Sequence, residues 1–195
     1  MSQSGGTLLD AGSGPRLRPR VYLAGPEVFL PDALEVLAAK KRICLPLGLE
    51  PVAPLIDTPP PPAATARARA FAIAAGNEAL IRSCVAVIAN LSPFRGVSAD
   101  VGTVYEVGLA RGLGLALFAY TCDPRDYAAR VLADPDGLDI EDFGLSDNLM
   151  IEGGIAGAGG TFLRVSAPSA DPWRDLGTFT ACARAAAAAL AARPR

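Results

Sequence analysis

The chain contains no histidine. This absence excludes catalysis by serine–histidine–aspartate or cysteine–histidine arrangements, and it excludes every zinc site that needs an imidazole ligand. Lysine is nearly as scarce, because only Lys40 and Lys41 are present and neither stands in a GxxxxGK sequence, so there is no phosphate-binding P-loop. An enzyme with this composition has to draw its acid–base and nucleophilic chemistry from Asp, Glu, Tyr, Cys, Ser or Thr.

Closely spaced cysteines are also missing. The four cysteines are separated by 40, 38 and 60 residues (Cys44, Cys84, Cys122 and Cys182). Metal sites and disulfide frameworks in small proteins use much closer spacing. We therefore expect four buried, reduced thiols and no metal site.

The chain has neither a surplus of positive charge nor a long apolar run. Its net charge of −2 argues against a nucleic-acid partner, which usually requires a basic surface. Hydrophobic residues make up 51% of the chain, but many are alanines, and no stretch of 18 strongly apolar residues predicts a membrane span. No apolar segment follows Met1, so we expect no secretory signal and a cytoplasmic location.

The length of 195 residues suits one sizeable domain. Residues 1–19, rich in Gly, Ser and Pro, are expected to form a flexible tail, and residues 20–195 a single catalytic domain. The expected strands are 20–24, 49–55, 85–89, 115–120 and 161–165, and the expected helices 31–47, 63–83, 99–113, 127–132 and 173–192. This alternation predicts an α/β fold with a parallel sheet, helices on both faces, and ligands at the carboxyl ends of the strands.

One carboxylate stands out in the segment NLSPFRGVSADVGTVYEVGLA, residues 90–110. Between Asp100 at the helix start and Arg111, Glu106 is the only charged residue of the predicted helix, whereas a solvent-facing helix usually spreads several charges over its outer face. Glu106 is therefore either a solvated outlier or a placed functional group. Asp100, near the helix start, suits an N-cap as well as a functional role.

The run DVGTVYEVGLA, residues 100–110, resembles the DxGxxxExGxA signature of the nucleoside 2-deoxyribosyltransferases. Further matches are the first strand and its Tyr-bearing turn (VYLAGP, 21–26), the loop of one branch of the family (NLSPFRG, 90–96) and a late Ser-Asp-Asn motif (GLSDNL, 144–149). The resemblance covers residues 20 to about 152. It implies a flavodoxin-like three-layer sandwich with a five-stranded, mainly parallel sheet, and no cofactor.

The resemblance also implies a role for each matching residue. Glu106 would be the nucleophile that attacks C1′ of a 2′-deoxyribonucleoside and holds the sugar as an ester until a second base collects it. Tyr22 would orient Glu106, unless it is an ordinary core aromatic, and Asp100 would bind the sugar hydroxyls. Asn148 would reach the 5′ side of the sugar in a neighbouring subunit, which implies a homo-oligomer, at least a dimer.

The base side of the site departs from the family pattern. Many members carry an Asp where this chain has GNEAL, residues 76–80. Asn77 can hydrogen-bond a base but cannot protonate it, so Asp57 and a bound water are alternative proton donors. Phe29 would stack on the base or belong to the core. Gly25 in the first turn is also expected to contact the substrate, a nucleoside or a free nucleobase.

Two other functions remain open. A hydrolase of 2′-deoxynucleoside 5′-phosphates would use the same Glu106 with water as acceptor, and it would need phosphate-binding groups. The first loop offers Glu27 and no serine, which disfavours a phosphate, whereas Arg95 keeps this alternative open. A non-catalytic nucleotide-binding sensor would keep the fold, but it would not need Glu106 together with Tyr22 and Asp100. Both purine and pyrimidine bases are compatible with the sequence.

Overall fold

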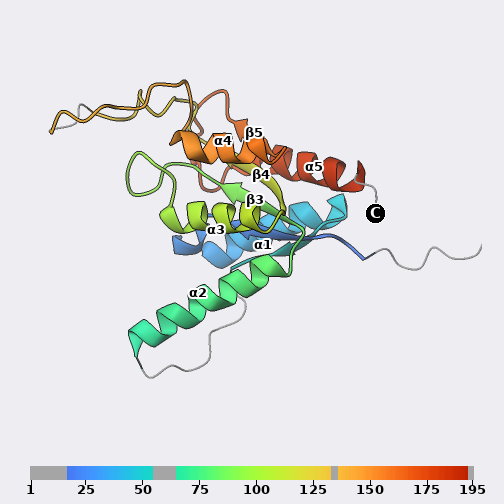
Figure 1. Cartoon of the computed structure of the whole chain (residues 1–195). Helices are drawn as coiled ribbons and strands as arrows, with labels where there is room; N and C mark the ends of the chain where they lie inside the picture. Colours follow the sequence, from blue (N-terminus) through green and yellow to red (C-terminus); the bar gives the residue numbers. More distant parts are fainter. Residues whose placement is uncertain (1–16, 55–64, 133–135, 193–195) are drawn as a thin grey trace, which may run out of the picture.

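A computed structural model describes residues 17–54, 65–132 and 136–192 (Figure 1). The strands are β1 (Arg20–Ala24), β2 (Glu50–Val52), β3 (Ala86–Asn90), β4 (Ala116–Thr121) and β5 (Thr161–Arg164). The helices are α1 (Ala33–Cys44), α2 (Ala66–Arg82), α3 (Val101–Gly112), α4 (Leu149–Gly157) and α5 (Gly177–Ala192), with short 3₁₀ turns η1 (Pro26–Phe29) and η2 (Leu45–Leu47).

The five strands form one sheet in the order β2-β1-β3-β4-β5, and every pairing is parallel. This is the strand order of the flavodoxin-like fold, so the predicted fold class is confirmed. The order reverses between β1 and β3, where the loops that follow the two strands diverge. Sheets of this kind bind ligands at that point.

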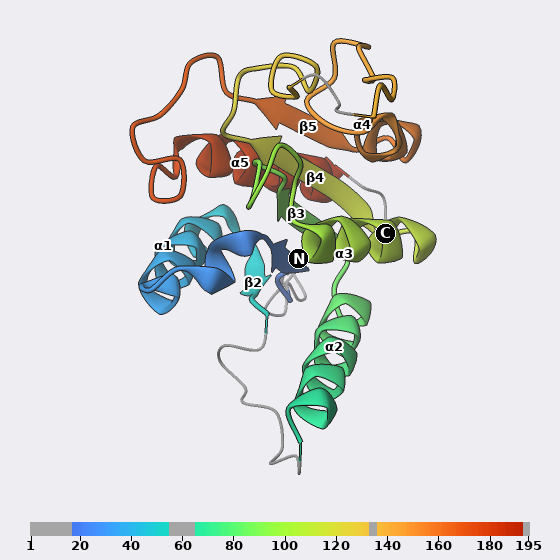
Figure 2. The ribbon, with the colours of Figure 1, turned by 90° about the vertical axis from the view of Figure 1, so that its left-hand side faces the viewer.

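Helices cover both faces of the sheet, with α1 and α5 on one side and α2, α3 and α4 on the other (Figure 2). Side chains alternate along β1, so Val21 and Leu23 pack toward α1 and α5, whereas Tyr22 and Ala24 face α3. Tyr22 therefore points toward α3, the helix that carries Glu106. The amino-terminal half of α2 extends beyond the sheet (Figures 1 and 2).

The prediction of a helix at residues 127–132 was wrong. These residues form a single turn, because the Tyr127 backbone N–H pairs with the carbonyl oxygen of Leu145 and fixes the segment to another loop. The helix of this region is α4, which the sequence did not predict because it contains three glycines of low helix propensity. Tertiary packing supplies the missing stability, since Ile155 of α4 is 1% exposed.

Of the remaining expectations, some agree with the structure, one differs and some fall outside the described residues. The four cysteines are buried and free. The second strand is shorter than predicted, at three residues around Pro51. The four-proline run and Asp57 fall within residues 55–64, and most of the expected tail falls within residues 1–16, so they lie outside the described residues. Across the described ranges, the helices are too short or too polar to traverse a lipid bilayer.

A buried polar network joins the loops at the carboxyl edge of the sheet. Glu27 is 2% exposed and forms an ion pair with the equally buried Lys40. The same Glu27 oxygen accepts hydrogen bonds from Asn90 Nδ2 at 2.7 Å and from the Tyr120 hydroxyl at 3.2 Å. Asn90 Oδ1 in turn accepts from the Ser92 hydroxyl at 2.6 Å. The network fixes the turn after β1 to the loop after β3, which leads to α3.

Candidate active site

Tyr22 and Glu106 meet although 84 residues separate them in the chain. Tyr22 is fully buried on β1, and its hydroxyl donates a hydrogen bond to Glu106 Oε1 at 2.6 Å. Glu106 lies on the face of α3 that turns toward β1, about 1.7 helical turns after Asp100. Glu106 is therefore not a solvated outlier but the hydrogen-bond partner of a buried tyrosine.

The surroundings of Glu106 raise its pKa from an ordinary value of 4.5 to about 7. Burial is the main cause, because it penalises the charged form, and the negative charge of Asp100 adds to it. The hydrogen bond from Tyr22 acts in the opposite direction and favours the carboxylate. Burial and the Glu106 charge raise the pKa of Tyr22, so Tyr22 remains a protonated donor. At neutral pH, Glu106 therefore populates both the protonated and the ionised form.

Asp100 caps the amino terminus of α3. Its Oδ2 accepts hydrogen bonds from the backbone N–H and the hydroxyl of Thr103, both at 2.9 Å. Gly102 leaves room for this carboxylate, since a Cβ there would lie 3.1 Å from the same oxygen. The Asp100 side chain therefore fulfils the N-cap role, while its charge still influences Glu106.

Two buried side chains that the sequence analysis missed hold the loop before α3. Asp147 Oδ2 accepts a 2.7 Å hydrogen bond from the backbone N–H of Ala99, the neighbour of Asp100. Arg130 donates to the carbonyl oxygens of Val97, Arg125 and Ser146. Burial lowers the pKa of Arg130. Together the two side chains tie three loops to the start of α3, a role that no local pattern signals.

Asn148 lies at the start of α4. Its Oδ1 accepts from the Met150 backbone N–H at 3.0 Å, which makes it the N-cap of α4. Its Nδ2 donates to Glu141 at 2.9 Å. The neighbouring Asp147 contacts the loop beside Asp100 of the same chain, so the Ser-Asp-Asn motif packs close to its own α3.

The structure brings together only some of the residues that were predicted to contact the nucleobase. Glu78 accepts a 2.6 Å hydrogen bond from the Tyr105 hydroxyl and forms an ion pair with Arg82 of its own helix. Asn77 is half-buried on α2. Gly25 is buried, and a Cβ there would lie 2.1 Å from the Glu27 carboxylate. A glycine is therefore needed at position 25 for packing against Glu27, whatever else it contacts.

Phe29 belongs to an aromatic cavity of about 250 Å³. We call it the aromatic cavity; it is lined by Pro26, Phe29, Leu30, Phe94, Arg95 and Trp173. The Phe29 ring is 55% exposed and stacks on Phe94, with ring centroids 5.3 Å apart and an interplanar angle of 19°. Trp173 meets Phe94 edge-on at 6.3 Å. An exposed ring such as that of Phe29 suits stacking with a planar ligand better than a core role.

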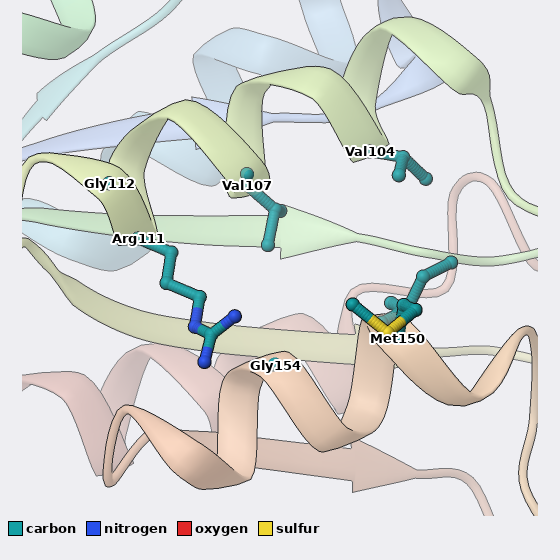
Figure 3. Close-up of a pocket in the computed structure, with 8 residues that line it drawn as sticks. Val104, Val107, Arg111, Gly112, Met150 and Gly154 are labelled. Atoms are coloured by element: carbon teal, nitrogen blue, oxygen red, sulfur yellow. The ribbon is translucent and has the colours of Figure 1, made fainter.

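A larger groove of about 510 Å³ runs between α3 and α4 (Figure 3). Arg111 reaches from α3 toward α4, where Gly154 and Gly157 leave room for its guanidinium (Figure 3). The groove is lined mainly by apolar side chains and includes neither Glu106 nor Asp100. The Glu106 carboxyl therefore does not line this groove.

Comparisons with known proteins show which family the chain is similar to. The family model described as Nucleoside 2-deoxyribosyltransferase matches residues 21–150. The uncharacterised protein C191.05c of Schizosaccharomyces pombe is 31% identical, with the match covering 75% of this chain and 81% of that protein. A solved 2-desoxiribosyltransferase from Leishmania mexicana is 34% identical and has a TM-score of 0.53. The match covers 68% of this chain and 85% of that chain. A conserved protein from Enterococcus faecalis V583 shares the fold, with 20% identity and a TM-score of 0.50. The match covers 76% of this chain and 92% of that chain.

Proposed function

The chain belongs to the nucleoside 2-deoxyribosyltransferase family, and from this premise we propose that it moves the 2-deoxyribosyl group between nucleobases. The observation that carries the proposal is the buried Tyr22–Glu106 pair beside Asp100. A carboxyl with a pKa of about 7 supplies both a nucleophilic carboxylate at neutral pH and a leaving group that departs from C1′ in the second step.

In the first step, an oxygen of ionised Glu106 attacks C1′ of the donor nucleoside. The C1′–N bond breaks, its electron pair leaves with the base, and the base takes up a proton. The transition state is oxocarbenium-like, and the product is a deoxyribosyl ester of Glu106. In the second step, a nitrogen of another base attacks C1′ from the opposite side, loses its proton, and releases the Glu106 carboxylate. The sugar thus retains its configuration.

The neighbouring residues divide the remaining tasks. Tyr22 holds one oxygen of Glu106 so that the other oxygen faces C1′. Asp100 binds the sugar hydroxyls, Phe29 stacks on the base, and Asn77 hydrogen-bonds its edge. Because Asn77 cannot protonate a departing base, the proton comes from Asp57 or from a bound water.

We further propose that Asn148 of one subunit contacts the 5′ side of the sugar bound by a neighbour, so the protein works as a dimer or larger homo-oligomer. The long connection that carries Asn148 supports this proposal, because long loops in compact domains are usually functional. Exposed apolar side chains lie on the same segment, with Leu138 68% and Phe143 66% exposed.

The transfer reaction is tested by incubating the protein with deoxyinosine, with and without adenine, and separating the products by chromatography. We expect deoxyadenosine and hypoxanthine when adenine is present, and little free deoxyribose without it. Equal release of deoxyribose in both reactions would identify a hydrolase and contradict the transferase proposal. Absence of both reactions in the folded protein would favour a non-catalytic nucleotide sensor.

We expect Tyr22→Phe to move the pH dependence of the reaction. Loss of the hydroxyl removes the interaction that lowers the pKa of Glu106, so this pKa rises beyond its value of about 7. The acidic limb of kcat against pH therefore shifts to higher pH, and kcat falls at pH 7 by about tenfold, while KM changes little. Thr103→Ser, which keeps its hydroxyl near Asp100, serves as a matched control. An unchanged pH profile and rate would assign the Tyr22 hydroxyl to the core alone.

A further inference from the structure

Arg95 has an unusual conformation in the loop between β3 and α3. Its φ of 54° makes it the one non-glycine residue with a left-handed backbone among the described residues. Such a conformation costs free energy and persists where the surroundings or a function maintain it. The loop follows β3 at the reversal of strand order, where sheets of this kind bind ligands.

This conformation places the Arg95 guanidinium over the aromatic cavity. Its Cζ lies 5.0 Å from the ring centroid of Phe29 and 4.6 Å from that of Phe94. Within the described part of the chain, Arg95 makes no hydrogen bond or ion pair, and the residue is exposed. All five of its N–H donors are therefore available to a ligand that binds in the aromatic cavity.

The side chains of the aromatic cavity offer hydrogen-bond donors but no acceptor. The two polar groups in its lining are the Arg95 guanidinium and the indole N–H of Trp173, and both only donate. The aromatic rings can stack on any base, because every base has a π face. Discrimination between bases in this cavity therefore depends on which base presents acceptors to the guanidinium.

We propose that Arg95 is a specificity-determining residue that favours 6-oxopurines, hypoxanthine and guanine, over adenine. A 6-oxopurine presents O6 and N7 side by side, and a guanidinium donates to both at once. Adenine carries an amino group in place of O6, so a hydrogen-bond donor of the base would face a donor of the guanidinium. This inference rests on the proposed function, since that function makes a nucleobase the ligand of the aromatic cavity.

Trp173 allows the proposal to be tested by binding alone. It is the only tryptophan of the chain and it lines the aromatic cavity, so its fluorescence reports a base that enters there. We expect titration with hypoxanthine to give a dissociation constant about tenfold or more below that for adenine. Arg95→Met should remove this difference by weakening hypoxanthine binding, with little effect on adenine. Because free bases carry no sugar, the titration does not depend on whether the protein transfers deoxyribose.

Arg67→Met is the matched control, because Arg67 also stacks on a phenylalanine, at 5.1 Å from the Phe71 ring, but on the exposed helix α2. It should leave both dissociation constants unchanged. Equal affinity of the wild-type protein for hypoxanthine and adenine would overturn the proposal, as would equal weakening of the binding of both bases in Arg95→Met.

A second titration, in Glu106→Gln protein, compares deoxyinosine with its 5′-phosphate. If Arg95→Met weakens only the phosphorylated compound, the ligand of Arg95 is a phosphate and the proposal fails.

Discussion

Glu106→Gln is expected to lower the rate of deoxyribosyl transfer by about a thousandfold or more, because an amide cannot form the covalent sugar ester. The substitution keeps the shape of the side chain and an oxygen that can accept from Tyr22. Transfer rates are measured with deoxyinosine and adenine, and circular dichroism checks the fold. Glu35→Gln, a change of an exposed carboxylate on α1, should leave the rate unchanged.

The ester itself can be trapped. A 2-fluoro-2-deoxyribosyl donor slows the second step, so peptide mass spectrometry should locate the added sugar on Glu106. A label on another carboxylate, or substantial transfer by well-folded Glu106→Gln, would exclude Glu106 as the nucleophile.

The same variant should be more stable than the wild-type protein at alkaline pH. Folding raises the pKa of Glu106, so the folded protein holds this proton more tightly than the unfolded chain. The resulting stabilisation is complete below pH 4.5 and is lost as the pH rises through about 7. Glu106→Gln avoids this loss, and its free energy of unfolding should exceed that of the wild type by about 3 kcal/mol at pH 8. Denaturant titrations at pH 4.5 and pH 8 measure the difference.

Mixing inactive Glu106→Gln subunits with inactive Asn148→Ser subunits should restore about a quarter of the wild-type transfer rate. In randomly mixed dimers about half of the assemblies are hybrids, and each hybrid contains one site with both residues intact. Serine is the appropriate replacement because it keeps the N-cap of α4 while removing the amide. The recovery is measured after subunit exchange has been confirmed by native mass spectrometry.

A second mixture provides the control. Glu106 and Asp100 lie on one helix, α3, so mixing Glu106→Gln with Asp100→Asn subunits creates no site with both residues intact. No recovery is expected there. If the Asn148 mixture also fails to recover, Asn148 serves its own chain, where Asp147 already binds the loop beside Asp100.

The order and type of most elements follow from the sequence, because they depend on local patterns. The apolar run at β3 and its alternation with helical segments predict a buried parallel strand, and the structure has Ala86–Asn90 there, fully buried. The absence of histidine limits the reactive groups to a few residue types, and the absence of nearby charges singles out Glu106. Where local preference and tertiary packing disagree, as in glycine-rich α4, the sequence misleads.

The chemical properties of the site depend on contacts between residues that are far apart in the chain. The pKa of Glu106 is raised by burial and lowered by a hydrogen bond from a tyrosine 84 residues away. Asp147 holds the backbone of Ala99 across 48 residues, and Lys40 neutralises Glu27 inside the protein. Spacing along the sequence encodes none of these contacts. Burial, charge and hydrogen bonding act through space, so only the folded structure brings Arg95 over the rings of Phe29 and Phe94.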